Sequence, residues 1–300
     1  MDDEVIWTDL TATEVADALT TISGQTVSPY TVEQLFDQEG YGQRQAQKVC
    51  TMGEHPDRDA QFHRIAEIKK EYLDSPNPVL SIDTKKKELL GNFYRDGQLF
   101  TRAMIKTFDH DFPSFADGVV IPHGLYDLKR NCGYLHLGTS RDTSEFACDS
   151  LEDWWLRFGR NLYPQASSIL LLCDGGGSNS SRTHLFKDDL QNFVDRVGMP
   201  VRVTHYPPYT SKYNPIEHRL FCHVTRACRG VIFKSVALVK ELMEKTRTRT
   251  GLSVVVDILD RVYETGRKVA EDAKRTWNLV RDAFLPLWNY RMLPNRKIPG

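Results

Sequence analysis

Three carboxylates in this sequence stand where a metal-dependent site could form. Asp83 and Asp174 each end a short apolar run that predicts a buried strand, and Glu217 lies at the start of a predicted helix. Carboxylate oxygens are the ligands that Mg²⁺ prefers. Two such ions about 3.5–4 Å apart can stabilise the attacking and the leaving oxygen of a displacement at phosphorus. As an ordered trio on strand, strand and helix, the three residues predict a metal site for phosphoryl transfer.

Each carboxylate also has a simpler interpretation. Aspartates at strand ends often cap turns. Asn214 is a good helix N-cap and Pro215 suits the first helical position, so Glu217 falls where a capping-box glutamate would sit. The glycine-rich segment after Asp174 matches neither common phosphate-binding glycine motif, but its glycines would let a DNA backbone come close. For Glu217, both the catalytic and the capping interpretation stay open.

The elements around the trio follow the order of an RNase H-like, retroviral-integrase-like α/β domain. Because the three carboxylates are far apart in sequence, only such a fold can join them. Hydrophobic periodicity predicts the elements. The predicted strands are 79–83, 88–94, 118–128, 133–138, 168–174 and 201–206, and the predicted helices are 143–158, 181–197 and one that holds Glu217 and ends near 228. A strand at 252–258 and helices at 236–246 and 268–288 are expected to follow.

The N-terminal part is expected to be a separate helical region. Helices are predicted over 11–19, 30–38 and 60–73, and a proline-rich break follows at 75–78. This indicates a helix-turn-helix-like region at 1–75 and a catalytic domain with a C-terminal helical extension at 76–300. Residues 1–39 contain no Lys or Arg, which disfavours phosphate contacts and leaves a protein-contact module as the alternative.

Positive charge near the trio predicts the DNA contacts. The net charge is only −1, so the chain as a whole gives no sign of binding a polyanion. Cations nevertheless flank the carboxylates in sequence, and they are Lys85, Lys86, Lys87, Lys212 and Arg219. We expect these five to contact DNA, although clusters of this kind are often only solvated faces.

Composition narrows the cellular setting. No apolar run is long enough for a transmembrane helix, and the acidic start differs from the basic beginning of a signal peptide. The six cysteines are scattered and form no CxxC pair. We therefore expect a cytoplasmic protein without membrane partners, associated with the nucleoid when bound to DNA.

Several longer motifs indicate a family. The chain resembles the DDE transposases of bacterial insertion sequences in the Rhodopirellula-type, also called ISAzo-type, family, from roughly residue 25 to about residue 290. The motifs that carry the resemblance are HPDRDAQF (55–62), SIDTKKKELLGNF (81–93), HDFP (110–113), IPHGLYDLKRN (121–131), TSRDTSEFA (139–147), DGGGSN (174–179) and TSKYNPIEHRLF (210–221).

The resemblance implies an activity and a site. Asp83, Asp174 and Glu217 would be the catalytic and metal-binding triad, and two Mg²⁺ or Mn²⁺ ions are expected. The reaction would be cleavage and strand transfer of insertion-sequence DNA by a homo-oligomer bound to transposon ends and target DNA. The family usually has a longer N-terminal region. A truncated remnant, acting as a non-specific nuclease or a non-catalytic DNA-binding protein, is therefore the alternative.

Overall fold

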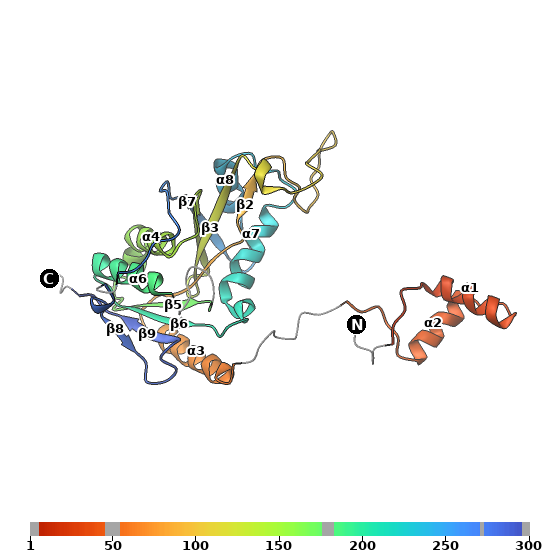
Figure 1. The fold of residues 1–300 in the computed structure, drawn as a ribbon, viewed down its shortest axis with the longest axis horizontal. Helices are drawn as coiled ribbons and strands as arrows, with labels where there is room; N and C mark the ends of the chain where they lie inside the picture. The colour runs from red at the N-terminus through yellow and green to blue at the C-terminus, as the bar shows by residue number, and fades with distance from the viewer. Residues whose placement is uncertain (1–5, 46–54, 176–182, 271–272, 296–300) are drawn as a thin grey trace. The chain divides into compact units, whose positions relative to one another are not determined.

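The computed structural model describes residues 6–45, 55–175, 183–270 and 273–295 (Figure 1). Contacts divide the chain into two compact units, Met1–Thr51 and Met52–Gly300. Within the described ranges, no helix is both long enough and apolar enough to cross a membrane. The glycine-rich segment 176–179 and the first two residues of the predicted helix 181–197 lie outside these ranges.

The first unit contains the two helices that the sequence predicts there, α1 (Ala12–Ser23) and α2 (Pro29–Gln38). Thr11 and Glu14 form a capping box at the start of α1, and the Ser28 side chain caps α2. Local capping thus defines where both helices begin.

The second unit is built on a mixed sheet with the strand order β7–β4–β3–β1–β5–β6–β9–β8, and β2 pairs with β3 beside it. The strands are β1 (Val79–Thr84), β2 (Glu88–Leu90), β3 (Gly118–Asp127), β4 (Cys132–Gly138), β5 (Ile169–Cys173), β6 (Val201–His205), β7 (Ser253–Ile258), β8 (Leu279–Arg281) and β9 (Asn289–Met292). β1 is antiparallel to β3 and parallel to β5, and β5 is parallel to β6. The core order β4–β3–β1–β5–β6 is that of an RNase H-like domain, which confirms the predicted fold.

Helices cover both faces of this sheet, and β1 shows how the faces alternate. Leu80 and Ile82 pack with α4 and α6 on one face, whereas Val79 packs with α3 on the other. Figure 1 shows α4 and α6 on one side of β5 and β6 and α3 on the opposite side. The helices and helical turns of this unit are α3 (Arg58–Leu73), η1 (Pro113–Phe115), α4 (Ser144–Trp154), η2 (Trp155–Gly159), α5 (Arg160–Leu162), α6 (His184–Val197), η4 (Ser211–Tyr213), η5 (Glu217–Phe221), α7 (Cys222–Ala227), α8 (Val236–Glu244) and η6 (Ala273–Arg275).

Helix α3 packs with the sheet, although the sequence places the domain boundary after it, at residue 75. Ile65 and Ile68 are buried against Val79 and Leu170. The Gln61 side chain also donates to the carbonyl of His205 at 2.8 Å. The proline-rich break at 75–78 is therefore a turn inside the second unit, and the contacts divide the chain after Thr51 instead.

The C-terminal part departs from the predicted helix 268–288. Its described residues form η6 and the strands β8 and β9, so the expected helical extension is wrong there. The reason is tertiary, because β8 lies within 268–288 and pairs with β9, which follows that range and pairs with β6. The predicted strand 252–258 and the predicted helix 236–246 are present as β7 and α8.

Candidate active site

Asp83 and Asp174 lie at the same edge of the sheet because their strands are parallel neighbours. Ile82 of β1 is in register with Cys173 of β5, so the next residue of each strand is one of the two aspartates. Asp83 accepts a hydrogen bond from the backbone N–H of Thr84 at 2.7 Å. The fold therefore joins two acidic residues that are remote in sequence.

Asp174 is held through its backbone by a buried histidine. His205 shares the register of Cys173, and its Nδ1 lies 3.1 Å from the Asp174 carbonyl oxygen. Burial lowers the pKa of His205 to about 4, so the ring is neutral at pH 7. A carbonyl only accepts, so Nδ1 carries the proton and donates it, which leaves Nε2 to accept from the Tyr290 hydroxyl at 3.3 Å.

Glu217 reaches the same edge because the start of its helix is bonded to β1. The Asn214 side-chain nitrogen donates to the Ile82 carbonyl at 3.2 Å, one residue before Asp83. The Ile216 N–H donates to the Ser81 hydroxyl at 2.9 Å. These bonds place Glu217 beside the strand that carries Asp83.

The described part of the chain does not contain the hydrogen bond that a capping role of Glu217 would require. A capping-box glutamate accepts from the N–H of the N-cap residue. The N–H of Asn214 instead donates to the Ser211 carbonyl at 2.8 Å. Glu217 also opens a wide π-helical turn, η5, a feature that occurs frequently at functional sites.

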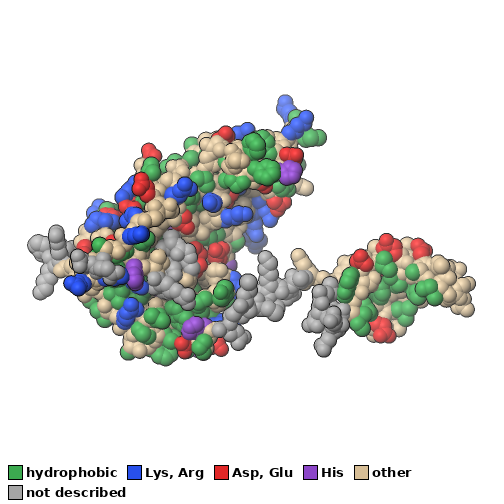
Figure 2. All heavy atoms as spheres, in the orientation of Figure 1, with side chains coloured by type: hydrophobic (Ala, Val, Ile, Leu, Met, Phe, Trp, Pro, Cys, Tyr) green, Lys and Arg blue, Asp and Glu red, His purple; other side chains and the backbone are tan. Residues whose placement is uncertain are grey.

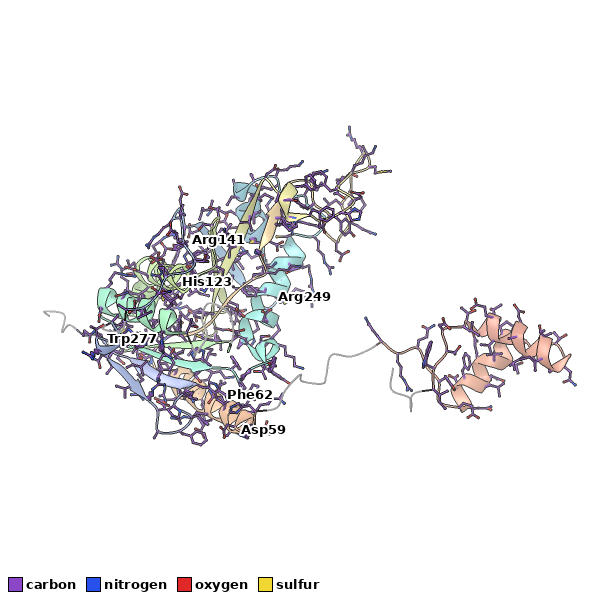
Figure 3. All side chains as sticks on the ribbon, viewed as in Figure 1. Asp59, Phe62, His123, Arg141, Arg249 and Trp277 are labelled. Carbon is purple, nitrogen blue, oxygen red and sulfur yellow. The ribbon has the colours of Figure 1, made fainter. Side chains whose placement is uncertain are left out.

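The turn before this helix is anchored to α3. Phe62 lies near the start of α3 (Figure 3), and its ring contacts Tyr213 edge-on with centroids 5.1 Å apart. On the other side, a Cβ on Gly175 would come within 2.9 Å of the Tyr206 carbonyl oxygen, so the residue after Asp174 must be small. The segment from β6 to Glu217 thus packs closely against the end of β5.

Electrostatics show that the three carboxylates act on one another. Burial, then repulsion by Asp174 and more weakly by Glu217, raises the pKa of Asp83 to about 8. Burial and Asp174 also raise the pKa of Glu217, while Lys85 opposes that rise. The three groups therefore share one site in which negative charge is poorly compensated.

The chemistry of the donor set suits a hard divalent cation, although the three side chains do not meet as closely as metal ligands do. Among the described residues, no group of three or more His, Cys, Asp or Glu side chains is placed to hold a metal ion. Carboxylates that repel one another separate, and a cation between them removes that repulsion. The three oxygen donors and the raised pKa values of Asp83 and Glu217 fit Mg²⁺ or Mn²⁺.

The five cations predicted to contact DNA differ in their surroundings. Lys85 is largely buried and pairs with Glu88, so it is no free surface cation. Lys86, Lys87, Lys212 and Arg219 are exposed. Figure 2 shows Lys and Arg side chains gathered where Figure 1 places α7, with acidic side chains beside them.

Two further residues near the trio were not singled out from the sequence. Asp142 accepts a hydrogen bond from the Thr84 hydroxyl at 3.0 Å and contributes to the raised pKa of Asp83. Gly124 is the β3 partner of Asp83, and a Cβ there would come within 2.6 Å of the Phe221 ring. Both residues lie in motifs of the family resemblance, Asp142 in TSRDTSEFA (139–147) and Gly124 in IPHGLYDLKRN (121–131).

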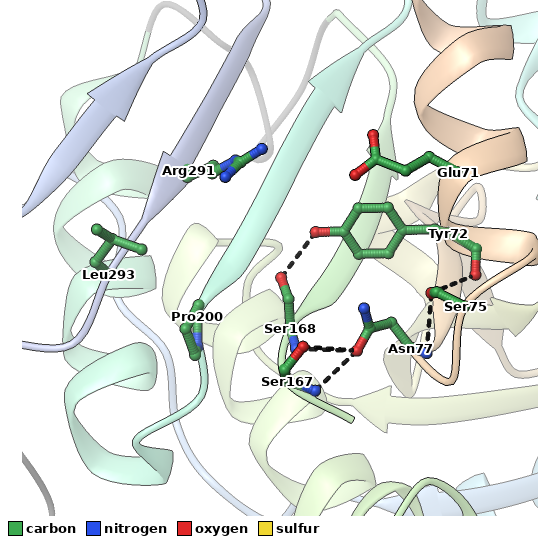
Figure 4. Close-up of a pocket in the computed structure, with 9 residues that line it drawn as sticks. All are labelled: Glu71, Tyr72, Ser75, Asn77, Ser167, Ser168, Pro200, Arg291 and Leu293. Atoms are coloured by element: carbon green, nitrogen blue, oxygen red, sulfur yellow. Dashed lines mark hydrogen bonds between the residues drawn. The ribbon is translucent and has the colours of Figure 1, made fainter. Parts of the chain in front are cut away.

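A separate hollow lies at the opposite edge of the sheet (Figure 4). It is formed where α3 ends and where β5 and β6 begin, with Tyr72, Ser168, Pro200 and Arg291 among its lining residues. A five-residue strand spans roughly 17 Å, and the two aspartates lie at the other ends of β1 and β5. This hollow is therefore not part of the candidate active site.

Comparisons with known proteins identify the family. A family model described as the Rhodopirellula transposase DDE domain matches residues 1–294, a wider stretch than the motifs covered. No curated protein matches the chain. A solved structure of the Mos1 transposase paired-end complex with left transposon end is 15% identical, covering 81% of this chain and 74% of that chain with a TM-score of 0.48. The Mos1 strand transfer complex is 15% identical, covering 81% and 66% with a TM-score of 0.49.

The family match spans both units of the chain and includes all three carboxylates at the sheet edge. It confirms the resemblance carried by the sequence motifs. The chain belongs to the family of the Rhodopirellula transposase DDE domain and is a transposase.

Proposed function

We propose that Asp83, Asp174 and Glu217 are the catalytic triad of this transposase and hold two Mg²⁺ or Mn²⁺ ions. The observation that carries the proposal is their convergence from β1, β5 and η5 on one sheet edge, where burial and mutual repulsion raise the pKa values of Asp83 and Glu217. The reaction is cleavage of DNA strands at the ends of an insertion sequence and their transfer to target DNA.

The residues supply rigidity and charge. Asp83 lies near the end of β1 and Asp174 directly follows β5, and both strands are central and largely buried. Divalent ions bound there would stabilise the attacking and the leaving oxygen of the phosphoryl transfer. Asp83 must lose its proton to act as a ligand, so metal binding by this trio releases protons near neutral pH.

DNA is the proposed partner, and the enzyme acts on it as a homo-oligomer. The exposed cations Lys86, Lys87, Lys212 and Arg219 flank the triad in sequence and suit phosphate contacts. Lys85 has a different role, because it pairs with Glu88 and offsets the charge of Glu217.

A nuclease that cuts DNA without selecting transposon ends is the second candidate. The observation that favours it is the charge of the N-terminal helices. The would-be recognition helix α2 carries Glu33 and Asp37 and no cation. Such a helix gains little from phosphate contacts, which supply most non-specific affinity.

One assay separates these functions. Purified protein is incubated with Mg²⁺ or Mn²⁺, labelled element ends and a target plasmid, and the products are resolved on a gel. Joined products support the transposase, cut products alone support the nuclease, and a mobility shift alone indicates DNA binding without catalysis.

Glu217→Gln tests the triad within that assay. The substitution keeps the shape of the side chain and removes its charge, so cleavage should be lost while the protein stays folded. Glu241→Gln is the matched control, because Glu241 lies on α8 in an exposed pair with Lys245. Parental cleavage by folded Glu217→Gln protein would contradict the assignment.

A further inference from the structure

Two buried polar side chains join the strand of Asp83 to the helix of Glu217. The Ser81 hydroxyl donates to the side-chain oxygen of Asn214 and accepts from the Ile216 N–H at 2.9 Å. The Asn214 nitrogen donates to the Ile82 carbonyl at 3.2 Å. Ser81 and Asn214 are both fully buried, so water cannot replace these bonds.

This arrangement differs from an ordinary helix cap. An N-cap asparagine normally uses its own oxygen to accept from an amide in the first turn of its helix. Here that oxygen accepts from Ser81, and Ser81 accepts from the Ile216 amide in its place. A residue of β1 therefore caps the first turn, so the bond that satisfies the helix also fixes its position on the sheet.

The position of Ser81 on β1 places this link next to Asp83. Side chains two residues apart on a strand point to the same face, with a rise of about 6.6 Å between them. Ser81 and Asp83 thus share the face on which η5 packs, and Glu217 directly follows the amide that Ser81 holds. The acids repel one another, so an attachment that resists their separation is needed at this point.

We infer that Ser81 and Asn214 are positioning residues that hold Glu217 at a set distance from Asp83 and so determine the affinity of the triad for divalent ions. The inference rests on the proposed function, because it takes Glu217 to be a metal ligand. Both side chains are fully buried and would act through Glu217.

The first test measures metal affinity in Ser81→Ala protein. The change leaves the Asn214 oxygen and the Ile216 amide unpaired, and loss of a residue that orients a ligand typically weakens metal binding about 10–100-fold. We expect at least a tenfold higher Mn²⁺ concentration for the half-maximal thermal shift and for half-maximal cleavage. Cleavage at saturating Mn²⁺ should fall less than cleavage at limiting Mn²⁺.

Ser150→Ala is the matched control. Ser150 is equally buried, and its hydroxyl donates to the Phe146 carbonyl at 2.8 Å within α4, on the other face of the sheet. Both variants lose a buried hydroxyl, but only Ser81→Ala should change the Mn²⁺ dependence. An unchanged Mn²⁺ midpoint in Ser81→Ala would overturn the inference.

A double-mutant cycle tests whether the two residues act as one link. Because both substitutions remove the Ser81–Asn214 hydrogen bond, Ser81→Ala with Asn214→Ala should weaken Mn²⁺ binding by less than the product of the two single effects. Independent effects that multiply would contradict a shared link. If Ser81→Ala does not fold, Asn214→Ala alone provides the Mn²⁺ titration.

Hydrogen exchange separates failure of this inference from failure of the proposed function. The Ile216 amide should exchange at least tenfold faster in Ser81→Ala than in Ser150→Ala, with or without metal. Inactive Glu217→Gln together with a parental Mn²⁺ midpoint in Ser81→Ala overturns the positioning role alone. Cleavage by Glu217→Gln overturns the proposed function. An unchanged exchange rate of the Ile216 amide in Ser81→Ala would show that Ser81 does not hold this amide.

Discussion

At the scale of single residues, Asp83 shows how the proposed active site works against stability. Its side chain is largely buried and faces like charge from Asp174 and Glu217, which raises its pKa to about 8. A carboxyl with a raised folded-state pKa favours folding below its ordinary pKa near 3.8, and that contribution is lost as the pH rises towards 8. The protein should therefore lose stability across neutral pH when metal is absent.

Asp83→Asn should raise the melting temperature of metal-free protein at pH 8–9. Removal of a poorly compensated buried charge worth about 1 kcal/mol or more corresponds to roughly 2–4 °C in a domain of this size. Thermal denaturation in EDTA from pH 5 to pH 9 measures the effect, which should shrink towards pH 5. With Mg²⁺ present, the parent should instead have the higher melting temperature, because the ions stabilise the parent and not Asp83→Asn.

Asp153→Asn provides the opposite case. A hydrogen bond from His136 lowers the pKa of Asp153, so its charge is compensated in the folded protein. This variant should be less stable than the parent at pH 7. A metal-free Asp83→Asn protein that melts below the parent at pH 9 would show that Asp83 is not under electrostatic stress.

His123 carries a second prediction about pH. His123 is a fully buried residue of β3 (Figure 3). Burial, with a smaller contribution from His136, lowers its pKa to about 3. A histidine that is neutral when folded and has a pKa near 6.5 when unfolded reduces stability as the pH falls from about 6.5 to 3. His123→Gln should flatten the decline of the melting temperature over that window. An equally steep decline in the variant would contradict the prediction.

At the scale of elements, the site depends on how closely the helix of Glu217 approaches the sheet. A Cβ on Gly124 would come within 2.8 Å of the Ile216 side chain as well as clash with Phe221. Gly124 lies opposite Asp83 in the β1–β3 pair. A single glycine therefore lets η5 pack directly over the strand next to the site.

Gly124→Ala should move this helix outward and reduce both stability and cleavage. Overpacking of a tight interface costs about 1–3 kcal/mol. Gly118→Ala, on the same strand, is the control, because its Cβ would meet only Leu90 at an ordinary 3.5 Å. Denaturant unfolding and the cleavage assay measure the two effects, and equal behaviour of the two variants would count against the close approach.

At the scale of the whole molecule, the catalytic unit needs a helix that precedes its first strand. Ile65, Ile68 and Tyr72 of α3 cover Val79 and Leu170 on one face of the sheet. Gln61 adds buried hydrogen bonds to Thr204, His205 and Asn289, which link α3 to β6 and β9. Elements remote in sequence are thus joined through the buried Gln61 side chain.

This connection predicts how truncated chains behave. Residues 55–300 should fold and keep the melting temperature and Mn²⁺ response of the second unit. Residues 76–300 should be insoluble or melt at least about 10 °C lower, because apolar β-strand residues lose their cover and Asn289 loses its hydrogen bonds with Gln61. Thermal denaturation of both fragments is the measurement. Equal stability would support a boundary at residue 75.

The sequence alone determined most of the local elements and the family. Apolar runs indicated the buried strands, Asn214 and Pro215 indicated a helix start, and the motifs indicated the family that the comparison confirms. These features depend on neighbours within a few residues, so the order of residues suffices to find them.

Only the tertiary structure decided which remote groups meet. Parallel pairing of β1 with β5 brings Asp83 beside Asp174, and Ser81 takes over the cap of the helix that Asn214 begins. Pairing with β9 made Leu279–Arg281 a strand inside the range 268–288, where a helix had been expected. Such contacts form because burial and strand pairing outweigh local propensity. They stabilise the fold only when both partners are in place.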